Sequence, residues 1–103
     1  MKPEFVKSNK TESVKTFINP KNQTGLTYKL VIGSIPKKKL TRMDIYMDDY
    51  KFPERNRIYN KIRKICTKVK ASDMHNNRFM LLVARKLAKY GYGDVNVEIV
   101  LRV

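Results

Sequence analysis

The chain has 103 residues, of which 23 are Lys or Arg and only 9 are Asp or Glu, so its formal net charge is +14. This length allows one domain with a modest core, and a hydrophobic fraction of 42% is too high for a disordered basic tail. The sequence shows neither an apolar run near the ~18 residues that span a bilayer nor a secretory signal in its first residues. We therefore expect an intracellular protein, cytoplasmic or nucleoid-associated, or one inside a virion, and not a secreted protein.

Residues that carry metal or nucleophilic chemistry are scarce. Cys66 is the only cysteine, which excludes an internal disulfide and every multi-cysteine zinc site, and its place in an apolar stripe predicts a buried thiol. The only histidine, His75, is expected as a surface residue in the first turn of a helix. Asp44, Asp48 and Asp49 form the one carboxylate cluster, but on a strand the first two lie about 13 Å apart, too far for one ion. We expect no catalytic residue, no metal and no cofactor.

The first part of the chain predicts an arm followed by two strands. Residues 1–12 mix charged and polar side chains with few apolar ones, so we expect a flexible basic N-terminal arm ahead of a single α+β domain over residues 13–103. Ser13–Ile18 is expected to form a short strand. From Leu26 to Gly33 apolar and polar residues alternate, and this period of two predicts a strand with one apolar face.

Residues 40–50 fit two interpretations. The alternation of Met43 and Ile45 with polar neighbours favours a strand that forms a hairpin with the preceding strand. The alternative is a helix, because several of the same apolar residues also follow helical spacing and Thr41 with Asp44 has the spacing of a helix cap. We prefer the strand.

Two amphipathic helices are predicted next. Pro53 and Glu54 suit the first turn of the first helix, which continues as an apolar stripe at helical spacing. Ser72 or Asp73 is the expected cap of the second helix, which has a stripe of its own. Gly91 is placed to end the second helix in the left-handed conformation.

The last strand completes the expected fold. Residues 95–103 alternate between apolar and polar side chains, and we expect this strand to return into the sheet beside an earlier one. After the arm, the order is strand, strand, strand, helix, helix, strand. This order predicts an α+β domain of two layers, in which an antiparallel or mixed sheet of about four strands packs against two amphipathic helices.

The positive charge concentrates on the two predicted helices. Residues 54–90 carry eleven basic side chains against two acidic ones, Glu54 and Asp73. This charge forms one row on each helix: Arg57, Lys61, Lys64 and Lys68 on the first, and Arg78, Arg85 and Lys89 on the second. Because acidic partners at i, i+4 are missing, the rows repel each other unless a polyanion neutralises them. Their pitch of about 5–6 Å suits the phosphates of a nucleic-acid backbone.

Two further features bear on the mode of binding. Lys37, Lys38 and Lys39 lie at the tip of the expected hairpin, where a basic finger contacts nucleic acid. The alternative role of this loop is to protect a sheet edge from aggregation. The turn over residues 70–73 has the length found in helix-turn-helix proteins, but the broad apolar surface of the second helix disfavours that motif. We therefore expect contacts to phosphates without a base code.

These patterns predict a small, basic, non-enzymatic nucleic-acid-binding protein that contacts the phosphates of DNA or RNA through the two helical rows, assisted by the lysine loop and the arm. The alternative is a structural component of a large assembly, such as a virion or capsid auxiliary protein or a ribonucleoprotein subunit. In that case the charge would meet packed nucleic acid or an acidic protein surface. A small RNase is a third interpretation. Neither a membrane nor a small-molecule substrate is inferred as a partner.

Overall fold

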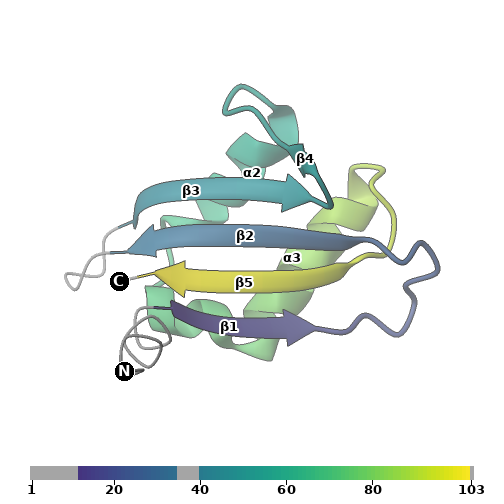
Figure 1. Cartoon of the computed structure of the whole chain (residues 1–103), viewed down its shortest axis with the longest axis horizontal. Helices are drawn as coiled ribbons and strands as arrows, with labels where there is room; N and C mark the ends of the chain where they lie inside the picture. The colour runs from purple at the N-terminus through teal and green to yellow at the C-terminus, as the bar shows by residue number, and fades with distance from the viewer. Residues whose placement is uncertain (1–11, 35–39, 103) are drawn as a thin grey trace, which may run out of the picture.

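A five-stranded mixed sheet forms one layer of the molecule, and two helices lie behind it (Figure 1). The computed structural model describes residues 12–34 and 40–102. In chain order the elements are β1 (Glu12–Phe17), β2 (Thr27–Ser34), β3 (Leu40–Met47), β4 (Tyr50–Lys51), α2 (Arg57–Cys66), the 3-10 helix η1 (Ala71–His75), α3 (Asn77–Lys89) and β5 (Asn96–Arg102). The predicted α+β class with two helices is confirmed. The sheet has five strands where about four were expected, because the two-residue β4 extends it beyond β3.

The strand order is β1-β5-β2-β3-β4, so the last strand of the chain lies in the interior of the sheet. β5 runs parallel to β2 and antiparallel to β1, with Ile99 opposite Leu30 on one side and Lys15 on the other. The expectation that the final strand returns beside an earlier one is therefore confirmed. Pairing on both sides satisfies the β5 backbone, and Val97, Ile99 and Val100 are all buried.

The segment that fitted both a strand and a helix is a strand. β3 pairs antiparallel with β2, which places Met43 opposite Ile32 and Ile45 opposite Leu30. All four side chains are at most 2% exposed, and only the strand period turns Met43 and Ile45 together toward the helices. The lysine loop, Lys37 to Lys39, and residues 1–11 of the expected arm lie outside the described residues.

Both helices begin later than their sequence patterns predict. The side chain of Asn56 caps α2 by accepting the backbone N–H of Ile58 at 2.8 Å, so Pro53 and Glu54 precede the helix. Asn76 caps α3 in the same way, by accepting from Arg78 N at 2.8 Å. These caps bind the first free N–H groups of the helices, and the buried side chains of Phe52 and Met74 hold the preceding segments against the core.

Neither Ser72 nor Asp73 caps α3, because both belong to the 3-10 helix η1. His75 also lies in η1 and not in the first turn of α3. Its Nε2 lies 3.0 Å from the carbonyl oxygen of Ile99, so this half-buried side chain donates to β5. At the other end of α3, Gly91 has φ of +93°, which confirms the predicted left-handed stop.

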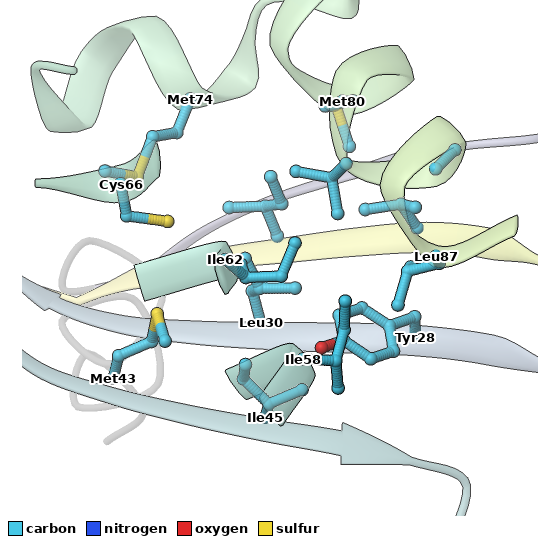
Figure 2. Close-up of a cluster of buried hydrophobic side chains, with 14 of the residues drawn as sticks. Tyr28, Leu30, Met43, Ile45, Ile58, Ile62, Cys66, Met74, Met80 and Leu87 are labelled. Atoms are coloured by element: carbon cyan, nitrogen blue, oxygen red, sulfur yellow. The ribbon is translucent and has the colours of Figure 1, made fainter. Parts of the chain in front are cut away.

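The core lies between the sheet and the two helices (Figure 2). Tyr28, Leu30 and Ile45 from the sheet meet Ile58 and Ile62 from α2, and Met80 and Leu87 from α3 close the other side. Cys66 is 1% exposed within this core, and its burial raises the pKa of the thiol to about 12. The predicted buried thiol is confirmed, and at neutral pH it is a protonated packing group.

The Tyr28 hydroxyl is the one buried side-chain polar atom of the described residues without a hydrogen-bond partner. Figure 2 shows it directed toward Ile58, and burial raises the pKa of this phenol above its usual range. Because a buried hydroxyl without a partner is destabilising, Tyr28→Phe is expected to raise the free energy of unfolding by about 1 kcal/mol. Urea denaturation measures the change. A loss of stability would show instead that the hydroxyl is hydrogen-bonded in solution.

Candidate nucleic-acid interface

The exposed faces of both helices are basic and free of acidic residues. α2 has the sequence RIYNKIRKIC and α3 the sequence NRFMLLVARKLAK, neither of which contains Asp or Glu. The apolar stripe of α2 is buried, which leaves its lysines exposed to solvent. Amphipathicity therefore directs the cations of α2 outward on a rigid element, because the opposite side of the helix is committed to the core.

A groove of about 520 Å³ runs between α2 and α3, and lysines from both helices line it. Its floor is apolar and is formed by Ile65, Val69 and Leu82. Its lysines are Lys61, Lys64 and Lys68 on the α2 side and Lys86 on the α3 side. We call this feature the interhelix groove. The structure thus brings together three predicted site residues with Lys86, which was not predicted because it lies one residue from the row expected on α3.

The predicted row on α3 does not join this groove. Arg85 lines a separate hollow on the other flank of α3, facing residues 17–21 at the end of β1. Arg78 and Lys89 are exposed on α3, but neither lines the interhelix groove. The two predicted rows therefore contribute to different surfaces of the molecule.

Arg57, the first residue of the predicted row on α2, has a structural contact of its own. Its guanidinium carbon lies 5.3 Å from the centre of the Tyr90 ring. This cation–π contact joins the beginning of α2 to the end of α3. Arg57 therefore has a role in holding the helices together that the other members of its row do not share.

A second basic hollow, a cleft of about 730 Å³, lies between the β3–β4 hairpin and α2. Its charged lining consists of Arg42, Asp44, Lys51, Glu54 and Arg63. We call it the Asp44 cleft. Arg63 and Asn60 also line a smaller hollow over α2, together with Lys61 and Lys64 of the interhelix groove. Shared walls therefore connect the cleft to the groove across the exposed surface of α2.

Asp44 holds two of the cations in this cleft. One carboxylate oxygen lies 3.2 Å from Arg42 Nε and the other 3.5 Å from Lys51 Nζ, so Asp44 neutralises two neighbouring basic side chains. The third ion pair among residues 12–34 and 40–102 joins Arg102 to Glu12 at 2.7 Å. No ion pair in this part of the chain involves a residue of α2 or α3, so their positive charge has no protein counter-ion there.

Tyr59 fixes the position of α2 relative to the cleft. Its hydroxyl donates to the carbonyl oxygen of Met43 at 2.6 Å and so joins the helix to β3. Burial raises the pKa of this phenol, although the neighbouring positive charge of Arg63 acts in the opposite direction. Tyr59 is therefore protonated at neutral pH and acts as a structural donor.

In the described ranges, no group of His, Cys, Asp and Glu side chains could hold a metal ion. Within the same ranges, no helix has the length and hydrophobicity needed to cross a membrane. No family model, no curated protein and no solved structure matches this chain. Any function proposed for this chain therefore depends on the geometry and charge of its own residues.

Proposed function

We propose that the protein is a non-enzymatic nucleic-acid-binding protein that places phosphates along the exposed surface of α2 and in the interhelix groove. The observation that carries the proposal is the set of four lysines lining this groove, none of which has an ion-pair partner among the described residues. Lysines three or four residues apart on a helix are about 5–6 Å apart, which allows neighbouring phosphates to be contacted in sequence. Because such contacts do not read base edges, we expect affinity without strong sequence preference.

The second candidate function is that of a subunit in a large assembly that contains nucleic acid or an acidic protein. The observation that favours it is the edge strand β1, which pairs only with β5 among the described strands. Val14 on β1 is 54% exposed, and Ile18, which follows the last residue of β1, is 67% exposed. An unpaired edge beside exposed apolar side chains is a surface on which a neighbouring subunit can add a strand.

The proposal is tested by salt titration of the nuclease-treated protein with fluorescent duplex DNA, single-stranded DNA and an RNA hairpin. Anisotropy is expected to show binding at about 50 mM salt, with log affinity falling linearly against log salt. Gel analysis of the recovered oligonucleotides checks that they stay intact, because cleavage would support an RNase. Poly-glutamate with the same negative charge as the oligonucleotide serves as the competitor. Negligible binding to all three nucleic acids, or equal affinity for poly-glutamate, would contradict the proposal.

A further inference from the structure

The Asp44 cleft differs in shape from the groove between the helices. The cleft is bounded by a hairpin on one side and by α2 on the other, and β3, β4 and α2 lie next to one another in Figure 1. Its volume of about 730 Å³ is sufficient for a single nucleotide unit. A row of lysines on a helix can contact a continuous nucleic-acid backbone, whereas a cleft of this size can enclose one phosphate and the groups next to it.

The neutral hydrogen-bond donors that line the cleft are already used within the protein. The Tyr59 hydroxyl donates to the Met43 carbonyl oxygen at 2.6 Å. The side-chain amide of Asn60 donates to the carbonyl oxygens of Glu54 at 3.1 Å and Asn56 at 3.0 Å. The side-chain donors that remain for a ligand are therefore cationic, and they favour an anion over a neutral polar molecule.

Asp44 forms ion pairs with two of these cations. Its side chain is 18% exposed and contacts Arg42 through Nε, which leaves the terminal nitrogens of the guanidinium for another acceptor. Lys51, from the neighbouring strand, reaches the other carboxylate oxygen at 3.5 Å. Because the side chains of Arg42 and Lys51 are 72% and 54% exposed, they remain accessible to a ligand, and the Asp44 carboxylate competes with that ligand for both cations.

Arg63 supplies the third cation from α2. It is half-buried, and none of the ion pairs among the described residues includes it. The cleft therefore contains three cations, Arg42, Lys51 and Arg63, against two carboxylates, Asp44 and Glu54. An anion bound beside Arg63 would supply the missing counter-charge, and an arginine suits a phosphate because its nitrogens can donate in pairs.

We propose that the Asp44 cleft binds one phosphate group of the nucleic acid through Arg63, Lys51 and Arg42, and that Asp44 limits the affinity by pairing with two of these cations. This proposal rests on the proposed function, because the nucleic-acid backbone would reach the cleft along the connected basic surface of α2. The phosphate comes either from an internal phosphodiester or from a 5′ end. In both cases the cleft sets the register of a strand that the lysines of the groove hold loosely.

The test compares Asp44→Asn with Asp49→Asn in the anisotropy assay. Both variants remove one negative charge from the same hairpin region, but Asp49 is exposed and makes no ion pair with the described residues. Asp44→Asn is expected to increase affinity about fivefold, because it releases Arg42 and Lys51 to the phosphate, while Asp49→Asn changes it less than twofold. Equal effects of the two variants, or weaker binding by Asp44→Asn, would overturn the proposal.

A second pair of variants tests the arginine directly. Arg63→Gln is expected to weaken binding about tenfold, against less than threefold for Arg55→Gln, an exposed arginine that lines none of the hollows described above. An unchanged thermal midpoint for each variant shows that the fold is intact. Equal losses for Arg63→Gln and Arg55→Gln would overturn the assignment of Arg63.

Oligonucleotides with a 5′-phosphate or a 5′-hydroxyl distinguish the two sources of phosphate. A tighter complex with the 5′-phosphate that depends on Arg63 assigns the cleft to strand ends, and equal affinities assign it to internal phosphodiesters. If the unaltered protein binds no nucleic acid, the proposed function itself fails. If the protein binds but the Asp44 and Arg63 variants behave as their controls do, only the role of the cleft fails.

Discussion

Replacing both Lys64 and Lys68 with Glu is expected to lower the affinity for nucleic acid about 100-fold at low salt. Both side chains are exposed on the α2 side of the interhelix groove, and neither has an ion pair among the described residues. The exchange removes two of the proposed phosphate contacts and places two repelling carboxylates in the same groove. The slope of log affinity against log salt is expected to fall by about two, one for each lost lysine contact.

Lys15→Glu with Lys21→Glu is the matched control for this prediction. Lys15 lies on the edge strand β1 and Lys21 in the following turn, and both are exposed and away from the interhelix groove. Because each Lys→Glu exchange removes two positive units, both double variants have a net charge of +10 instead of +14. The control is expected to weaken binding less than tenfold, through the reduced overall field alone.

The comparison separates a defined surface from general attraction between a basic protein and a polyanion. If the two double variants weaken binding equally and leave equal salt slopes, the charge acts without a preferred surface and the groove has no special role. Circular dichroism and thermal melting show whether each variant keeps its fold. Since all four lysines are exposed, the melting midpoint is expected to stay nearly unchanged.

Replacing Ile62 with Ala is expected to lower the free energy of unfolding by about 2–5 kcal/mol. Ile62 is 0% exposed and lies in the middle of the α2 stripe, facing the sheet as Figure 2 shows. The smaller side chain leaves a cavity that the sheet and α3 cannot fill without moving, and it removes buried apolar surface as well. Urea denaturation followed by circular dichroism measures the loss.

Leu82→Ala is the matched control, because Leu82 is 41% exposed in the interhelix groove. This variant is expected to cost less than about 1 kcal/mol, since much of the removed surface is already in contact with water. A loss as large as that of Ile62→Ala would mean that Leu82 is covered in solution. Similar small losses for both variants would contradict the assignment of Ile62 to the centre of the core.

The secondary-structure predictions were confirmed where they depended only on residues close together along the chain. The alternating residues that became β2, β3 and β5 and the stripes that became α2 and α3 are all local patterns. The predicted starts of both helices were wrong, because Asn56 caps α2 after the expected first turn at Pro53 and Glu54, and Asn76 caps α3 in place of Ser72 or Asp73. The burial of Phe52 and Met74, which a local pattern does not show, fixes the segments before these caps.

The residues of the candidate site also fall into two groups, those that a local pattern predicts together and those that only the fold brings together. Lys61 and Lys64 lie on one flank of α2, and Lys68, which the sequence placed on the same helix, lies in the turn just after it but on the same groove. The Asp44 cleft combines Arg42 from β3, Lys51 from β4 and Arg63 from α2. No spacing along the chain predicts that these three residues share a cleft, because their approach depends on how α2 packs against the hairpin.

The sequence by itself determined that two acid-free amphipathic helices would turn basic faces away from a shared core, because periodicity states which face of a helix is buried. Only the tertiary structure decided which basic residues meet. It turned Lys86 toward α2 and Arg85 toward the end of β1, since the neighbour on each flank of α3 depends on how the helix lies against the sheet. Part of the positive charge thereby forms a connected basic surface around α2, and Arg85 lies apart from it on the far flank of α3.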